Sequence, residues 1–405
     1  MTVKNLKLFA LPGIMLLLAG CCGAPQLCIK SSGTAYAAEA LKSYVDSGAL
    51  PGAVSVLCKG DIQETVCIGW ANAEKKTPIT MNSTFMQCSQ TKGFCGVTIA
   101  ILVEEGRLSL DDPVHKYLPE FKNLKVAVKG KDGKVSLVPA RNTLTIRMVM
   151  NHTGGFPFEI PTKVKKGWPG LPLRATAKEA ASQPLQFEPG TRVLYSNTGI
   201  DIGAAVIEVI TGKGWDQFLK ERVLDPLGMK DTTFQPTEEQ LSRSISMYSI
   251  KKGAKPRFCA YNRWMPLPHN GPGVYPSAGA GLWTTPNDQL KFYRMLMNLG
   301  KGDNGVRILK EETVKNLLAV NTRPPRLGGG YSLGLIADGR GAMGHGGAWN
   351  TRCTVNWQKK QLLLWVVQLV GGPHPWYNEW RKAANRFFAA EFNDGGTGAY
   401  TGRLK

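Results

Sequence analysis

Ser89 and Lys92 have residue types and a spacing that suit covalent catalysis. They stand three residues apart in Cys88-Ser89-Gln90-Thr91-Lys92. Residues three apart in a helix share one face, so the hydroxyl and the amine can touch. Partial removal from water disfavours the ammonium form of a lysine, and its neutral amine can then take a proton from serine. The pair therefore predicts a serine nucleophile activated by a lysine base.

The residues after Lys92 predict the helix that this chemistry requires. Residues 94–103 are apolar on most sides, as in a buried helix, and Gly106 is placed as a C-terminal stop. Ser89 then lies at the helix N-terminus, where free backbone N–H groups and the helix dipole favour a developing negative charge. A second Ser-x-x-Lys match at residues 249–252 is basic and opens no apolar helix. We interpret it as a solvated loop.

Tyr195 and Asn197 form a second candidate motif, because Tyr195-Ser196-Asn197 is the only Tyr-x-Asn in the chain. A tyrosine near a lysine can relay protons, and an asparagine amide can orient the lysine or bind a substrate carbonyl. Taken alone, the motif is more often a helix-capping turn than a catalytic site.

The third motif is His345-Gly346-Gly347-Ala348, just before a predicted strand. Two glycines allow a substrate backbone to lie along a strand edge. The N–H of Ala348 could face the N–H of Ser89 and complete a two-donor oxyanion hole.

In this order, the three motifs resemble those of the serine β-lactamase and penicillin-binding protein superfamily, Ser-x-x-Lys, Tyr-x-Asn and Lys/His-x-Gly. The resemblance is closer to the class C-type branch, which includes esterases and D-aminopeptidases, and it spans roughly residues 36–392. It implies an α+β fold, with an antiparallel sheet flanked by helices and the site at its junction with an inserted helical domain. The landmarks between the motifs that agree with it are residues 104–113, 151–155, 226–232 and 277–282.

The resemblance also implies a role for each residue. Ser89 would be acylated, Lys92 would take its proton, and Tyr195 would assist as base and then protonate the leaving group. Asn197 would position the lysine and the substrate.

His345 stands where lactamases of this superfamily place a lysine. A histidine is neutral much of the time at neutral pH, so it should anchor a β-lactam carboxylate less well. This favours an esterase, amidase or peptidase over a true β-lactamase. The N–H groups of Ser89 and Ala348 would form the oxyanion hole.

Other kinds of site find little support in the sequence. The five histidines contain no His-x-x-x-His pair, so no metal site is predicted, and no cofactor is implied. There is no Gly-x-Ser-x-Gly, which excludes the α/β-hydrolase pattern. His152 is expected to hold its glycine-rich turn.

Most predicted strands lie near both ends of the chain, and helices, loops and one inserted hairpin at residues 124–142 fill the middle. The domain prediction is an α/β domain from residues 35–80 and 328–393, an inserted mainly helical domain from residues 81–327, and a tail from residue 394 to 405. The predicted strands are 53–57, 65–70, 125–129, 134–138, 331–337, 351–357 and 362–369, and the predicted helices include 35–47, 145–150, 199–211, 215–223, 287–299, 310–320 and 378–392.

Residues 1–20 predict a signal peptide. Lys4 and Lys7 precede an apolar run from residue 8 to 18, and Leu18-Ala19-Gly20-Cys21 resembles a bacterial lipobox. Cleavage before Cys21 and lipidation of its thiol are expected, with residues 21–34 as a tether. The protein is then predicted to be exported and anchored to a bacterial membrane.

The net charge of +20 would suit an anionic neighbour such as lipid headgroups, acidic wall polymers or sulfated glycans, but a solvated basic surface is the favoured interpretation. No nucleic-acid motif accompanies the charge, and nucleic acid is not an expected partner. The cysteines show no disulfide framework: counting outward from the turn at Gly60 places Cys58 opposite Gln63, away from Cys67.

These observations predict a lipid-anchored serine hydrolase that cleaves a small-molecule or peptide-like ester or amide through an acyl-enzyme. One alternative is a D,D-carboxypeptidase or β-lactamase acting on peptidoglycan or penicillins. An alternative of another class is a non-hydrolytic binding module on the same fold, against which the intact set of three motifs argues.

Overall fold

The structure of the protein is a computed structural model that describes residues 30–31, 35–160, 172–251, 254–259, 275–327, 330–371 and 374–390. The expected signal peptide, the lipidation candidate Cys21, most of the tether and the tail lie outside these residues. Among the helices that are described, none is both long and apolar enough to cross a lipid bilayer.

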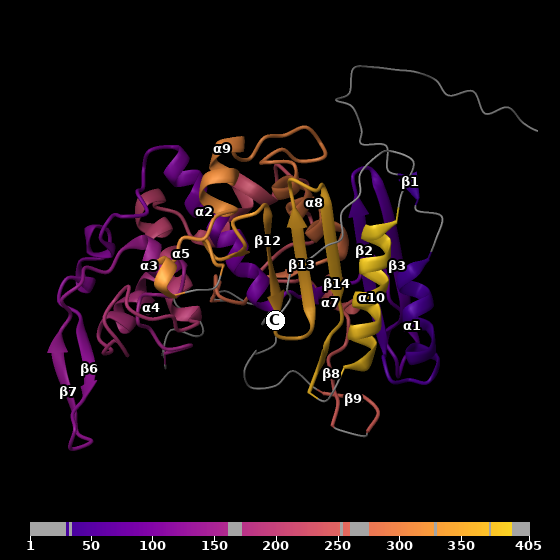
Figure 1. Cartoon of the computed structure of the whole chain (residues 1–405), viewed down its shortest axis with the longest axis horizontal. Coiled ribbons are helices and arrows are strands. Elements are labelled where there is room, and N and C mark those ends of the chain that lie inside the picture. Colours follow the sequence, from indigo (N-terminus) through magenta and orange to yellow (C-terminus); the bar gives the residue numbers. More distant parts are fainter. Residues whose placement is uncertain are drawn as a thin grey trace, which may run out of the picture.

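Strands from both ends of the described chain form one eight-stranded sheet (Figure 1). Its members are β1 (Lys30–Ser31), β2 (Gly52–Lys59), β3 (Ile62–Asn72), β4 (Thr77–Pro78), β11 (Ile336–Ala337), β12 (Ala342–Gly347), β13 (Thr351–Asn356) and β14 (Gln361–Val366). The order is β1-β3-β2-β14-β13-β12-β11, with β4 beside β3. Except for the parallel pair β1–β3, the neighbours are antiparallel. The predicted fold class is confirmed.

The β2–β3 hairpin has the expected register. Cys58 pairs with Gln63, while Cys67 pairs with Val54. None of the six described cysteines is in a disulfide.

Short strands outside the main sheet form three small sheets. They are β5 (Phe85–Met86) with β10 (Trp283–Thr284), β6 (Lys125–Lys129) with β7 (Val135–Pro139), and β8 (Tyr248–Ser249) between β9 (Arg257–Phe258) and β15 (Leu369–Val370).

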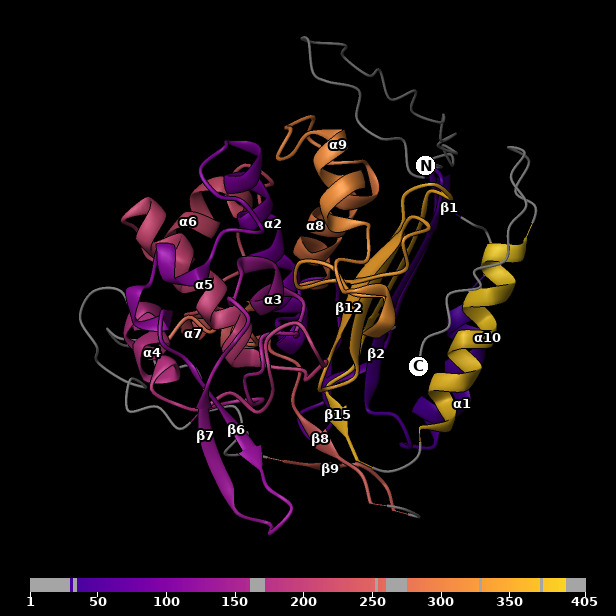
Figure 2. The same ribbon diagram turned by 60° about the vertical axis from the view of Figure 1, so that its left-hand side comes forward.

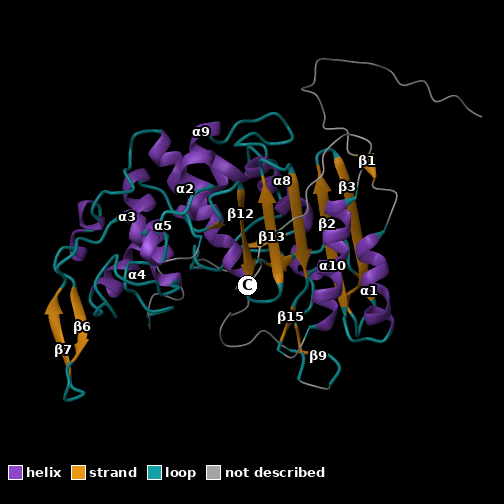
Figure 3. Ribbon diagram, viewed as in Figure 1, coloured by secondary structure: helices purple, strands orange, loops and turns teal. Residues whose placement is uncertain are grey.

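Helices joined by long loops are the main regular structure between β5 and β11 (Figure 3). The α-helices are α1 (Tyr36–Asp46), α2 (Thr91–Glu104), α3 (Ile146–Met150), α4 (Pro172–Ala181), α5 (Asn197–Thr211), α6 (Trp215–Leu219), α7 (Glu238–Ser242), α8 (Pro286–Met297), α9 (Glu311–Thr313) and α10 (Pro375–Ala389). The shorter turns are the 3-10 helices η1 (Cys88–Gln90), η2 (Val114–Lys116), η3 (Pro119–Phe121) and η6 (Pro325–Leu327), and the π-helices η4 (Lys220–Leu224) and η5 (Val314–Leu318).

The sheet separates two layers of helices (Figure 2). The terminal helices α1 and α10 cover one face, where Leu363 and Trp365 of β14 join their apolar cluster. Leu362 and Leu364 of the same strand point to the other face and belong to the larger core shared with α2 and α8. This alternation is the period of two that a strand buried on both faces requires.

Several boundaries differ from the sequence prediction. Strand β12 was not predicted, because glycine is depleted in strands and three of its six residues are glycine. The expected strand 331–337 is reduced to β11. Helix α4 and the short elements α7, β8, β9 and β10 lie in stretches for which no helix or strand was predicted.

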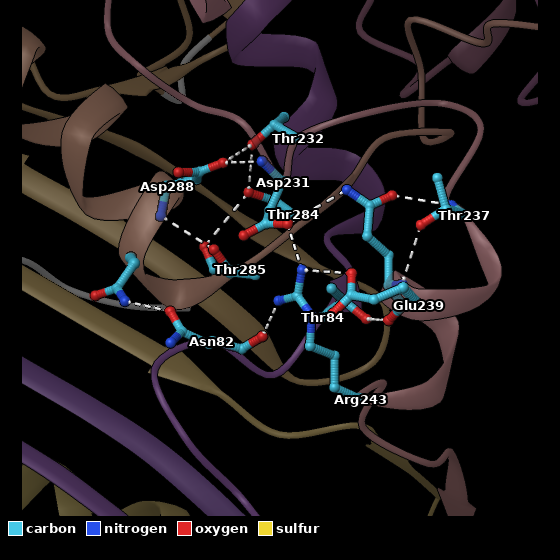
Figure 4. Close-up of polar contacts among 12 residues, drawn as sticks. Asn82, Thr84, Asp231, Thr232, Thr237, Glu239, Arg243, Thr284, Thr285 and Asp288 are labelled. Atoms are coloured by element: carbon cyan, nitrogen blue, oxygen red, sulfur yellow. Dashed lines mark hydrogen bonds and ion pairs between the residues drawn. The ribbon is translucent and has the colours of Figure 1, made fainter.

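A polar cluster fixes the segment behind the predicted nucleophile (Figure 4). Arg243 bridges Asp231 and Glu239, and the Asp231 N–H donates to Asp288 at 2.7 Å. Thr285 caps α8 by accepting from the Asp288 N–H at 3.2 Å. These contacts hold β10, which pairs with β5 immediately before Ser89.

Candidate active site

The turn η1 and helix α2 present Ser89 and Lys92 side by side. Lys92 Nζ lies 3.2 Å from Ser89 Oγ, as the spacing of three predicts. Ser89 sits in the 3-10 turn before α2, so the α-helix itself begins two residues later than the nucleophile. Cys88, directly before it, has a left-handed φ of 53°, a conformation that is strained for cysteine. The strained turn directs the Ser89 side chain toward Lys92, and Ser89 remains half-buried.

Lys92 is fully buried and surrounded by acceptors. Its Nζ donates to Asn197 Oδ1 at 2.6 Å and to the Gly279 carbonyl at 2.5 Å. Burial lowers the pKa of Lys92 to about 7, against a smaller opposing effect of the Asp201 carboxylate. A large fraction of Lys92 is therefore a neutral amine near neutral pH, which is the form that can act as a base.

Tyr195 and Asn197 reach the pair from the start of α5. Ser196 caps this helix by accepting from the Gly199 N–H at 3.0 Å, which places Asn197 in its first turn. The Tyr195 hydroxyl is hydrogen-bonded to Ser89, and Lys92 Nζ lies 4.6 Å from the centre of the Tyr195 ring. Burial raises the pKa of Tyr195, so it is a neutral phenol able to donate a proton.

His152 holds the backbone on either side of Tyr195. Its carbonyl accepts from the Leu194 N–H at 2.9 Å, and its Nδ1 accepts from the Ser196 N–H at 3.2 Å. Its ring centre lies 4.4 Å from that of Tyr195. Burial lowers the pKa of His152 well below its ordinary value, so it remains neutral. His152 was predicted to hold its own glycine-rich turn. In the structure it also fixes the position of Tyr195.

Asp201 and Gly279 complete the surroundings of Lys92. Asp201 was not predicted, and Gly279 belongs to the landmark 277–282 but was given no role at the site. Asp201 Oδ1 accepts from the Gly279 N–H at 3.0 Å, and its carboxylate also accepts from the hydroxyls of Tyr275 and Ser277. The same peptide segment points the Gly279 carbonyl at Lys92. Burial raises the pKa of Asp201 to about 6. Asp201 follows Asn197 by four residues, a helix-face relation that the sequence does contain.

Glu159 is a further residue that the motifs did not reveal. Its Oε1 accepts from Asn197 Nδ2 at 3.1 Å. This contact fixes the orientation of the Asn197 amide, because the nitrogen faces Glu159 and the oxygen faces Lys92. No residue pattern in the sequence pairs Glu159 with Asn197.

His345 lies on β12 within the same site. Its Nε2 is 3.1 Å from the Tyr331 hydroxyl and its Nδ1 is 2.6 Å from the Gly346 carbonyl. The ring centres of His345 and Tyr195 are 6.2 Å apart. Burial, followed by the nearby positive charge of Lys92, lowers the pKa of His345 to about 3. His345 is therefore neutral over the physiological pH range.

The residues after His345 run beside η1. A Cβ on Gly347 would lie 2.5 Å from the Gln87 carbonyl, so only glycine permits this approach. The segment brings Ala348 next to the Ser89 turn, where Ala348 is exposed. The N–H groups of Ala348 and Trp349 hydrogen-bond to the Cys88 thiol. The Ala348 N–H, which was predicted to bind the oxyanion, thus already donates to the Cys88 sulfur. Because sulfur is a weak acceptor, a substrate oxyanion can displace it.

All the predicted motif residues from 89 to 348 converge on one location, drawn from η1, α2, α5 and β12. The candidate Cys21 and part of the second Ser-x-x-Lys match fall outside the described residues. Among the residues that are described, no group of three or more His, Cys, Asp or Glu is arranged to hold a metal ion.

The chain is similar to proteins of known and unknown activity. Its relative Protein Rv1367c from Mycobacterium tuberculosis is 30% identical over 68% of this chain and 69% of the relative. Simvastatin synthase from Aspergillus terreus has a similar structure, with a TM-score of 0.73 and 20% identity over 89% of this chain and 98% of that protein.

A second structure, described as "EstCE1, a hydrolase with promiscuous acyltransferase activity", has a TM-score of 0.69 and 21% identity over 86% of this chain and 97% of that chain. At these identities the two solved structures support the fold alone. The profile of the family described as Beta-lactamase matches residues 37–385. The chain therefore belongs to the Beta-lactamase family.

Proposed function

We propose that the protein cleaves an ester or amide through an acyl-enzyme on Ser89. The observation that carries the proposal is a buried lysine with a pKa of about 7 lying 3.2 Å from the Ser89 hydroxyl. A neutral amine at that distance can remove the hydroxyl proton as Ser89 Oγ attacks the substrate carbonyl carbon.

The remaining steps use the groups around this pair. As the tetrahedral centre collapses, the bond to the leaving group breaks and the Tyr195 phenol supplies its proton, since Tyr195 hydrogen-bonds to Ser89 and has a raised pKa. The Tyr195 phenolate then takes a proton from the Lys92 ammonium, which received it from Ser89 and whose Nζ lies 4.6 Å from the centre of the Tyr195 ring. Water or an alcohol then attacks the acyl-enzyme by the reverse sequence and releases the acyl group.

The environment of His345 supports neutral esters and amides over β-lactams. A lysine at this position would offer a fixed positive charge to a substrate carboxylate, whereas His345, with a pKa of about 3, offers none. The description of EstCE1 as a hydrolase with acyltransferase activity is consistent with this preference. We therefore place esters and amides before penicillins and peptidoglycan stems as substrates.

Export and a lipid anchor are part of the same proposal. The support is the sequence of residues 1–21, with its basic start, apolar run and lipobox-like end. An anchored enzyme would act on substrates outside the cytoplasm.

The test is covalent labelling with a fluorophosphonate, followed by mass spectrometry of the peptide that contains Ser89. We expect one adduct on Ser89, none in Ser89→Ala, and hydrolysis of p-nitrophenyl acetate that is lost in parallel. A parallel incubation with penicillin G measures the β-lactam alternative. An unlabelled Ser89 in folded protein would instead indicate a binding module.

A further inference from the structure

The hairpin of β6 and β7 extends away from the helical part of the molecule in both viewing directions (Figures 1 and 2). Its register runs from Lys125 paired with Pro139 to Lys129 paired with Val135. It is attached to the body along β6: the Ala127 N–H donates to the Leu185 carbonyl at 2.9 Å, the Leu185 N–H donates to the Lys125 carbonyl at 2.8 Å, and Val126 is buried in the core. Among the described strands, β7 has no partner other than β6.

Large apolar side chains are exposed on both faces of this hairpin. Val135 and Leu137 are 64% and 53% exposed, and Val128 and Val138 are 43% and 39% exposed. The pairing places Val135 and Leu137 on one face and Val128 and Val138 on the other, since side chains alternate along a strand. Scattered apolar surface is ordinary, but a two-sided apolar ribbon that projects from the body requires an explanation.

The apolar side chains are accompanied by positive charge. Lys125, Lys129, Lys131 and Lys134 belong to the hairpin, and Asp132 is its only acidic residue. Lys134 lies 4.0 Å from Asp132, and both side chains are largely exposed. Within the described part of the chain, the other three lysines form no ion pair. The hairpin thus combines exposed apolar side chains on both faces with an excess of positive charge.

We propose that this hairpin docks onto an anionic lipid bilayer. A protein partner would cover one face of the ribbon, whereas the boundary between headgroups and acyl chains can surround both. The lysines would then contact lipid phosphates. Edge-to-edge pairing of β7 with a second copy is opposed by Lys134 directly before the strand and by Pro139 at its end.

The experiment measures hydrogen exchange of the full chain with and without vesicles. One set of vesicles contains equal parts of phosphatidylglycerol and phosphatidylcholine, and the other contains phosphatidylcholine alone. Exchange in peptides covering residues 125–139 measures protection of the hairpin alone, so membrane binding by another segment is not counted. We expect slower exchange in these peptides with the anionic vesicles only.

Two double variants of the hairpin, each with a matched control, test the lysine and the apolar contacts. Their binding is measured by titrating anionic vesicles and following hydrogen exchange in residues 125–139. Lys131→Gln with Lys134→Gln should weaken binding roughly 30-fold, since each lysine near an anionic surface contributes about a fivefold gain. Lys178→Gln with Lys301→Gln, at exposed lysines elsewhere, should not weaken it. Val135→Ser with Leu137→Ser should also weaken it, while Phe258→Ser with Ile336→Ser, equally exposed apolar positions, should not.

Several results would overturn the proposal. These are unchanged exchange in residues 125–139 with anionic vesicles, equal protection by neutral vesicles, or equal binding by the hairpin and control variants. Protection that appears without vesicles and increases with protein concentration would identify a second copy as the occupant instead. Circular dichroism and ester hydrolysis of every variant establish that it is folded, because the hairpin lies outside the catalytic site.

Discussion

Lys92 Nζ lies 3.2 Å from Ser89 Oγ in a site where the lysine is fully buried and the serine remains accessible. This difference in environment gives the two residues their complementary properties. Burial lowers the pKa of the lysine so that it can accept a proton, while accessibility leaves the serine open to a substrate.

The first prediction concerns Lys92 and Tyr195 as one proton-transfer unit. Lys92→Ala and Tyr195→Phe should each reduce kcat/KM for ester hydrolysis by about 10²–10⁴-fold, the usual cost of removing a positioned proton-transfer group. The double variant should lose much less than the product of the two, because neither residue can complete the transfer alone. Fully multiplicative losses would mean independent roles.

The second prediction concerns pH. Only neutral Lys92 is a base, so kcat/KM should rise with pH to a plateau, with a midpoint near the Lys92 pKa of about 7. The Asp201 carboxylate raises that pKa, so Asp201→Asn should move the midpoint to lower pH. Glu208→Gln, at another buried carboxylate of α5, should leave the midpoint unchanged. An unchanged midpoint in Asp201→Asn would show that Asp201 does not influence the pKa of Lys92.

The third prediction concerns the charge at position 345. His345→Lys should raise turnover of carboxylate-bearing β-lactams relative to neutral esters by roughly tenfold, the gain of a charge-assisted hydrogen bond. His345→Gln should not, because it adds no charge. The comparison is the ratio of kcat/KM for nitrocefin and p-nitrophenyl acetate. An equal effect on both substrates would show that position 345 does not face the substrate carboxylate.

The fourth prediction concerns Gly279. A Cβ at this position would lie 2.7 Å from Asn197 Cβ and 2.8 Å from Asn197 Oδ1. Gly279→Ala should therefore displace the Asn197 amide from Lys92 and reduce kcat by about 10²-fold, as small misplacements of catalytic groups do. Gly281→Ala meets Phe234 and the Ser277 carbonyl instead, and its activity should change far less. Thermal melting separates lost activity from lost folding in both variants.

The fifth prediction concerns the membrane anchor. Radiolabelled palmitate should be incorporated when the full chain is expressed in a bacterial host, and Cys21→Ser should abolish the labelling. Cys22→Ser, at the adjacent cysteine, should retain it. Labelling that survives the loss of Cys21 would contradict the lipobox interpretation.

The sequence alone determined the features that depend on short-range geometry. The contact between Ser89 and Lys92 follows from a spacing of three, which any helical turn converts into proximity. The β2–β3 register followed in the same way from the turn at Gly60, because strand pairing counts outward residue by residue. The order of the three motifs indicated the family and, through it, the fold class.

Tertiary structure decided the features that join distant parts of the chain. The contacts of Asp201 with Gly279 and of Glu159 with Asn197 depend on how loops pack, and no periodic pattern encodes them. Strand β12 was missed because its glycines weaken the local strand signal, and pairing with β13 on one side and β11 on the other holds it in the sheet.

The pKa values of Lys92 and His345 belong to the same class of property. They depend chiefly on removal from water, which many residues far apart in the sequence produce together. The sequence thus supplied the reacting groups, and the packing of the folded chain set their protonation.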